Sequence, residues 1–175
     1  MNIVSQSRLG QTDVLIPDDN YLGTVREFMD KDWSDPGSVK LRSGTMIRAV
    51  YVKNDSGSAI VGGKGCVYKA GYLGLYVGGL HSADARCDGV ADPFVASIAN
   101  GAYFWLVISG PCNVLIGTSG VSAGDALQTA TGGTFIALTD GNTYASGRAG
   151  IITADTVDTA TGRAYLNLSH QALIP

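Results

Sequence analysis

Glycine is spread unevenly along this chain of 175 residues, and its distribution restricts the folds that the chain can adopt. Only four of the 24 glycines lie in residues 1–44, which leaves 20 for the remainder. There they recur every few residues between short apolar runs. Glycine reaches positive φ without steric cost, so this spacing indicates many tight turns. Tight turns between short apolar runs are typical of an all-β sandwich or barrel.

The apolar runs between these glycines have the composition of β-strands, because β-branched and aromatic residues predominate in them. The run 102–109 (AYFWLVIS) is continuously apolar, which predicts a strand buried on both faces. Gly110-Pro111 follows it and predicts a hairpin connection to the run 112–117. The glycines within 62–65 predict a bulge or bend. The expected strands are 46–53, 59–69, 72–80, 102–109, 112–117, 125–130, 133–139, 148–154 and 164–169. We therefore expect an all-β fold, either an antiparallel β-barrel or β-tulip or a sandwich of short strands.

The first 44 residues carry more charge and show no strand alternation. Four apolar residues in this segment recur at the spacing of one helix face: Leu22, Val25, Phe28 and Met29. We therefore expect an extended N-terminal arm over residues 1–44, with a short amphipathic helix, ahead of a β-domain over residues 45–175.

The apolar side chains of this arm need a surface to pack on. They can lie along the chain's own β-domain or dock on a neighbouring subunit, and the sequence leaves both arrangements open. Aromatic residues dominate interface energetics, so Phe28 and Trp33 are the expected anchors. The candidate interface residues are Tyr21, Leu22, Val25, Phe28 and Trp33.

The low charge of the chain bears on its partners. Charged residues make up 15% of the sequence, below the usual quarter, which favours association, so we expect a homo-oligomer. The net charge of −3 is not segregated, and no basic stripe is available to neutralise phosphates, so nucleic acid is not an expected partner. No apolar run has the length of a membrane span, and the N-terminal residues lack a signal-peptide pattern. We therefore expect no membrane partner, and production in the cytoplasm.

The residues that could carry chemistry form no recognisable catalytic or metal-binding pattern. His81, Asp84 and Cys87 lie close in sequence, but a metal site needs three or four ligands and a Cys–His pair needs spatial contact. We interpret His81 as a loop residue, and a small enzyme built on these three residues is the weaker alternative. Cys66, Cys87 and Cys112 form no C-x-x-C pair and are expected to be reduced, partly buried thiols. We therefore expect no enzymatic activity, no cofactor and no metal.

The stretch VSAGDALQTATGG (121–133) combines glycine, aspartate and hydroxyl residues, yet it matches no phosphate-binding motif. Gly124-Asp125 and Gly132-Gly133 predict two tight turns around one strand. Aspartate is favoured in such turns because its carboxylate caps backbone N–H groups. The same interpretation applies to the remaining turn carboxylates, Asp140, Asp155 and Asp158.

This stretch is part of a longer pattern that resembles the small β-domain decoration, or cement, proteins that coat the capsids of tailed phages. The pattern has three parts: Gly101-Ala102-Tyr103-Phe104-Trp105 running to Gly110, then Ala123-Gly124-Asp125-Ala126-Leu127, then Gly147-Arg148-Ala149. The run VYVKNDSGSAIVGGKGCVY (50–68) resembles the opening hairpin of that family. The resemblance covers residues 46–169, while the arm and the segment 71–90 depart from it.

The resemblance implies a β-barrel or β-tulip domain that binds the major capsid protein on the outer surface of an icosahedral phage head and bridges capsomers. It further implies a virion protein assembled in the host cytoplasm, with a homotrimer favoured over a dimer. The alternative is a virion head-fibre or a receptor- or glycan-binding β-domain, in which exposed aromatic rings stack on sugars. The candidate rings for that role are Tyr21, Trp33, Tyr72, Tyr76 and Tyr144.

Overall fold

The described part of the chain is built of β-strands and two three-residue 3₁₀ turns, η2 (Asp19–Tyr21) and η3 (Thr131–Gly133). The computed structural model describes residues 19–31, 41–83, 85–118, 120–138, 148–153 and 160–168. The strands are β1 (Val25–Lys31), β2 (Leu41–Asn54), β3 (Ile60–Val61), β4 (Gly65–Tyr68), β5 (Tyr76–Leu80), β6 (Gly89–Ala91), β7 (Ser97–Ile98), β8 (Tyr103–Leu115), β9 (Ala126–Thr129), β10 (Phe135–Ala137), β11 (Arg148–Ile152) and β12 (Thr161–Asn167). The all-β prediction is confirmed.

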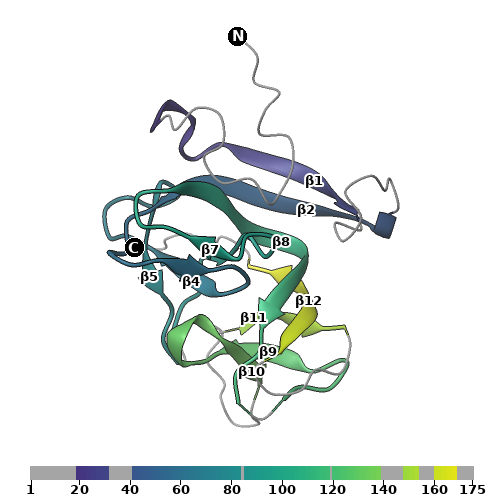
Figure 1. Cartoon of the computed structure of the whole chain (residues 1–175). Helices are drawn as coiled ribbons and strands as arrows, with labels where there is room; N and C mark the ends of the chain where they lie inside the picture. The colour runs from purple at the N-terminus through teal and green to yellow at the C-terminus, as the bar shows by residue number, and fades with distance from the viewer. Residues whose placement is uncertain are drawn as a thin grey trace.

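Ten strands form one sheet in the order β1-β2-β5-β4-β6-β8-β12-β11-β9-β10, and β3 pairs separately with β7. The pairing is antiparallel except between β2 and β5. An additional pairing of β2 with β8 curls the sheet back on itself, but β2–β5, β4–β6 and β6–β8 are joined by only two residue pairs each. The result is an all-β sandwich rather than a closed barrel. Figure 1 shows β1 and β2 across one end of the molecule and β9 and β10 at the opposite end.

The long strand β8 separates two apolar clusters. Tyr103, Trp105 and Val107 belong to the cluster shared with β1, β9 and β12, and the alternate residues, Phe104, Leu106 and Ile108, belong to the cluster shared with β4 and β7. Because successive side chains of a strand point to opposite faces, β8 is buried on both sides. The prediction from the apolar run 102–109 is confirmed.

The hairpin predicted at Gly110-Pro111 is wrong, because β8 continues through both residues. Gly110 has a φ of 94°, and a Cβ there would lie 2.2 Å from the carbonyl oxygen of Met46. Glycine is therefore needed for the positive φ and for the close approach of β2, not for a chain reversal. The register shift between β2 and β8 lies just before Gly110, between the pairs Ala49–Val107 and Arg48–Ser109. β8 pairs with β2 up to Ser109 and with β12 from Ser109 onward, so this region marks a change of partner.

The short helix predicted in the arm is also wrong. Residues 25–31 form strand β1, which pairs antiparallel with β2 through Phe28 opposite Ile47 and Met29 opposite Met46. Phe28 and Asp30 are buried, whereas Val25 and Met29 are exposed. Buried and exposed side chains thus alternate with the period of two of a β-strand. Asp30 occupies an inward position, and this buried charge conceals the strand alternation in the sequence.

The predicted turns are present. Glycines within 62–65 separate β3 from β4. The backbone N–H of Asp125 donates to the carbonyl of Ser122 at 3.0 Å, and the Asp125 carboxylate accepts from the Ser122 N–H at 2.9 Å. The prediction that Asp125 caps a turn is confirmed. Asp140, Asp155 and Asp158 lie outside the described residues.

Candidate interaction surface

The inward face of β1 packs on the core of its own chain. The Phe28 ring is 5% exposed and meets the Trp105 ring edge-on, with 5.1 Å between centroids and 73° between planes. The guanidinium carbon of Arg26 lies 6.0 Å from the same indole, within the range of a cation–π contact. The aromatic anchor expected at Phe28 is therefore used within the chain that carries it.

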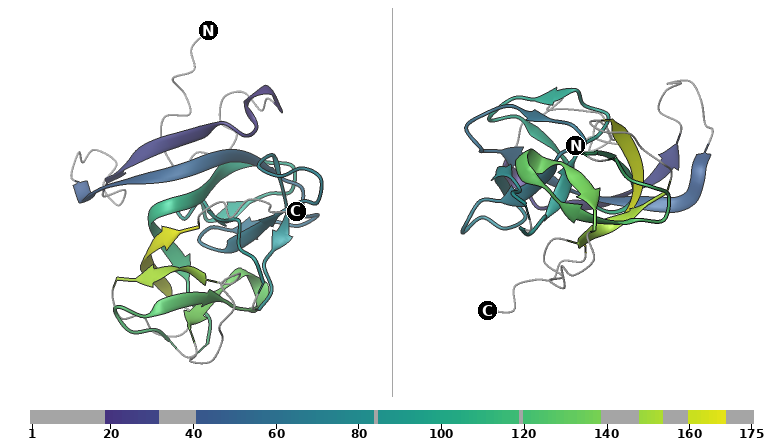
Figure 2. Two further views of the ribbon diagram at one scale, coloured as in Figure 1. Left: turned by 180° about the vertical axis from the view of Figure 1, so that it is seen from behind. Right: turned by 90° about the horizontal axis from the view of Figure 1, so that it is seen from below.

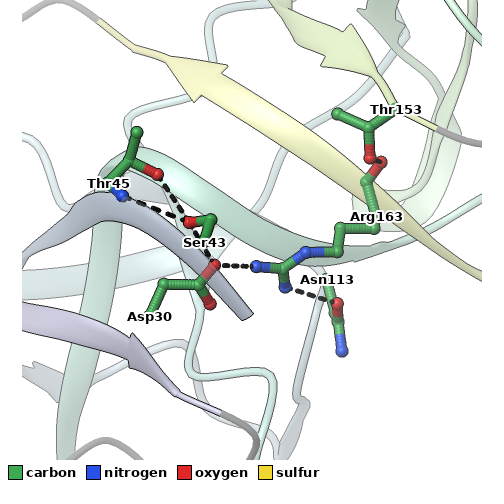
Figure 3. Close-up of polar contacts among 6 residues, drawn as sticks. All are labelled: Asp30, Ser43, Thr45, Asn113, Thr153 and Arg163. Atoms are coloured by element: carbon green, nitrogen blue, oxygen red, sulfur yellow. Dashed lines mark hydrogen bonds and ion pairs between the residues drawn. The ribbon is translucent and has the colours of Figure 1, made fainter. Parts of the chain in front are cut away.

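The next inward residue of β1 is Asp30, whose side chain is fully buried. The guanidinium of Arg163, on β12, forms an ion pair with Asp30 Oδ2 and donates to Asn113 Oδ1 at 3.3 Å (Figure 3). The Ser43 hydroxyl donates to the same Asp30 oxygen at 2.6 Å. A buried carboxylate is tolerated only when it is paired and hydrogen-bonded. This network holds β1 and the beginning of β2 against β8 and β12.

The turn η2 before β1 is fixed to the domain as well. The Tyr103 hydroxyl donates to Asp19 Oδ1 at 2.6 Å, and the Lys53 ammonium lies 3.5 Å from that oxygen. This hydrogen bond, with the Lys53 charge, lowers the pKa of the Asp19 carboxyl. The backbone N–H of Gly23 donates to the Tyr51 carbonyl at 2.9 Å. Residues 19–31 therefore pack on the β-domain of their own chain. This is one of the two arrangements that the sequence left open.

The outward face of β1 and the first half of β2 is exposed and carries apolar side chains beside the charged cross-strand pair Glu27 and Arg48. Met29 and Met46 are cross-strand partners and are 48% and 45% exposed. Val25 and Leu41 are exposed to a similar extent. We call these four residues the β1–β2 face. Figure 2 shows these strands reaching beyond the others at their end of the molecule.

Two features distinguish the β1–β2 face from scattered surface residues. Met29 and Met46 are direct cross-strand neighbours, and adjacent exposed apolar residues mark interaction sites more often than isolated ones do. β1 is also first in the sheet order, so among the described strands its outer edge has no strand partner. An unpaired strand edge can pair with another chain. The arrangement suits protein–protein contact rather than chemistry.

The predicted interface residues are distributed over three environments. Phe28 is buried, Tyr21 and Leu22 are half-buried against the core, and Val25 is exposed on the β1–β2 face. Trp33 and residues 32–40 lie outside the described residues. Their role in contacts with other chains stays a prediction. The list of candidate interface residues lacked Met29, Leu41 and Met46. Met29 was assigned to a helix face, and the exposure of Leu41 and Met46 follows only from the pairing of β2 with β1.

Two of the three candidate catalytic residues are buried. His81 lies in the loop after β5, as the sequence predicted, and its buried ring packs edge-on against Phe135 with 5.0 Å between ring centroids. Cys87 is buried, and burial raises the pKa of its thiol to about 12, which leaves it protonated and unreactive at neutral pH. Burial raises the pKa of Cys66 and Cys112 as well. Asp84 lies outside the described residues.

The described residues contain no group of three His, Cys, Asp or Glu side chains that could hold a metal ion. Within the same ranges, no helix is long and apolar enough to cross a membrane.

Comparison with known proteins defines the class of fold. No family model matches the chain, and no curated protein matches it in sequence. Among solved structures, the chain is similar to the N base of the head fibre gp8.5 of bacteriophage phi29, with a TM-score of 0.52 and 15% sequence identity. The match covers 69% of this chain and 94% of the gp8.5 chain. The two proteins share an all-β fold.

Proposed function

We propose that this protein is a structural, non-enzymatic component of a phage virion that binds the outer surface of the head as a decoration protein. Two independent observations support the proposal. The sequence pattern over residues 46–169 resembles phage decoration proteins, and the fold is shared with a protein whose structure is described as a phage head-fibre base. The observation that carries the mechanism is the exposed β1–β2 face, in which the apolar side chains of Met29 and Met46 lie directly opposite each other.

In this proposal the β1–β2 face docks on the major capsid protein or on a neighbouring copy of the chain, in a homo-oligomer for which we favour a trimer. The network around Asp30 and Arg163 holds the two strands in position before docking, so little conformational entropy is lost on binding. Binding to the assembled shell but not to free subunits stabilises the shell by mass action. Because many copies bind to one shell, their modest individual affinities combine into a stronger overall attachment.

The second candidate is a head-fibre base. The fold likeness favours it equally, because the solved neighbour is described as a head-fibre base. A decoration protein bridges capsomers and raises the thermal stability of the head. A fibre base attaches at the head surface but need not raise the thermal stability of the head. Head stability therefore separates the two candidates.

The experiment mixes the protein with heads that lack it, removes unbound protein by sedimentation, and measures occupancy and the temperature at which the heads open. The double variant Met29→Thr, Met46→Thr removes apolar area while keeping β-compatible residues at both positions. Val61→Thr is the matched control, because Val61 is 44% exposed on β3, away from this face.

We expect wild type and Val61→Thr to bind and to raise the opening temperature, and the double variant to lose occupancy. Binding without a rise in the opening temperature would favour the head-fibre candidate. Absence of wild-type binding would overturn both.

A further inference from the structure

The loop between β4 and β5 presents an exposed aromatic pair on a fixed backbone. Tyr72 is 47% exposed, and its ring meets that of Tyr76 edge-on with 5.0 Å between centroids. The Tyr72 N–H donates to the Lys69 carbonyl at 3.0 Å, and the Lys69 N–H donates to the Tyr76 carbonyl at 2.9 Å. Gly71 and Gly74, with φ of 81° and 75°, supply the turns. The rings are therefore held before any ligand arrives.

Polar groups stand directly beside this pair. The Lys69 ammonium lies 5.7 Å from the centroid of the Tyr72 ring and forms an ion pair with Asp55 from the turn after β2. Both charged side chains are more than two-fifths exposed. An exposed ring thus adjoins one strong donor and one strong acceptor of hydrogen bonds.

We propose that Tyr72, Tyr76, Lys69 and Asp55 form a binding site for a saccharide. A pyranose has an apolar face of C–H groups, which can stack on an aromatic ring, and a rim of hydroxyls that both donate and accept. The Tyr72 ring supplies the surface for the apolar face. The Lys69 ammonium donates to one hydroxyl oxygen, and the Asp55 carboxylate accepts from a neighbouring hydroxyl.

The size and composition of the site favour a saccharide over a protein. A stable protein interface needs about 800 Å² from each partner, more than one short loop with a single aromatic pair provides. The site also joins an apolar ring to charged groups within a few ångströms, whereas Met29 and Met46 of the β1–β2 face lie side by side.

The site is separate from the proposed docking face. Tyr76 pairs with Lys53, and Met46 lies seven positions earlier on β2, so the Met29–Met46 pair is about 23 Å away along an extended strand. Val25, opposite Val50, is nearer, at about 10 Å along the strand. A protein attached through Met29 and Met46 would leave this loop uncovered. Saccharide binding does not depend on that attachment, so it is testable on the isolated protein.

The test titrates the full-length, ¹⁵N-labelled protein with glucose, galactose and N-acetylglucosamine and with their tetrasaccharides, following backbone amide shifts by NMR. Tyr72→Ala removes the stacking ring, Tyr72→Phe keeps the ring and removes its hydroxyl, and Asp55→Asn removes the acceptor charge. Tyr165→Ala is the matched control, because Tyr165 is 45% exposed but lies on β12, outside the β4–β5 loop that forms the site.

We expect saturable shifts confined to residues 55 and 69–76 with at least one of these sugars. Tyr72→Ala should weaken binding by about tenfold or more, as loss of an aromatic anchor does, and Tyr72→Phe by much less. Asp55→Asn should also weaken binding, and Tyr165→Ala should not change it. Absence of saturable shifts, shifts elsewhere, or equal binding by Tyr72→Ala would overturn the proposal. A change of oligomeric state in Tyr72→Ala without any sugar-induced shift would also overturn it and assign the loop to protein contact.

Discussion

The buried carboxylate of Asp30 on β1 is ion-paired with the guanidinium of Arg163 on β12, 133 residues further along the chain. This contact joins the segment expected to be an arm to the last described strand. It also explains why a charged residue occupies an inward position of β1. The presentation of the β1–β2 face therefore depends on a polar contact beneath it.

Arg163→Met is expected to destabilise the fold by about 3–5 kcal/mol, because it leaves the buried Asp30 carboxylate without a counter-charge. The double variant Asp30→Leu, Arg163→Met should recover a large part of that loss, since no buried charge remains unpaired. Urea unfolding of the three proteins measures both effects. A double variant less stable than Arg163→Met would contradict this role for the ion pair.

Phe28→Ala is expected to cost about 3–5 kcal/mol, because it opens a cavity against the Trp105 ring. Met29→Ala, on the exposed face of the same strand, should change the unfolding free energy by only about 0.5 kcal/mol or less. Chemical denaturation followed by tryptophan fluorescence measures the difference. Equal effects of the two substitutions would show that β1 does not pack on its own core.

Gly110→Ala is expected to be strongly destabilising, since it combines an unfavourable positive φ with a Cβ placed 2.2 Å from the Met46 carbonyl oxygen. Gly124→Ala is the matched control. Gly124 has the same φ of 94° but open space around its would-be Cβ, so only the backbone cost of about 1–2 kcal/mol applies. Thermal unfolding of both variants tests this, and a similar loss in the two would argue against close approach of β2 and β8 at Gly110.

Stability is expected to fall as the pH drops from about 7 toward 5, because burial lowers the pKa of His81 below its ordinary value of about 6.5. Below that value the unfolded state takes up a proton that the folded state does not, so protonation favours unfolding. The Asp19 carboxyl, whose pKa is also lowered, contributes a further loss only at more acidic pH. Unfolding free energies measured across this range, in wild type and His81→Leu, provide the test. An unchanged slope in His81→Leu would exclude His81 as the source.

Much of the fold could be predicted from local signals. Glycine spacing and apolar runs identify most strands after residue 44, and the turn at Asp125 follows from side-chain capping. β6 and β7 were missed because strands of two or three residues have no readable alternation. Gly110 was misread because glycine is favoured both in a turn and at a positive-φ position inside a strand such as β8.

The candidate surface was harder to predict, for a physical reason. The inward position of Asp30 is stabilised by Arg163, a partner that no local pattern reveals. Without that contact, the apolar residues of β1 fit a helix face as well as a strand. The exposed pair Met29 and Met46 follows only from the register of β1 with β2. Long-range pairing therefore determines which side of the segment faces outward.

The most direct test of the proposed function is a cryo-EM map of phage heads that carry this protein. We predict density for the β-sandwich on the outer surface of the head, with the β1–β2 face against the capsid or a neighbouring copy and the Tyr72 loop uncovered. Density that attaches through the opposite end, at β9 and β10, with Met29 and Met46 facing solvent, would contradict the account.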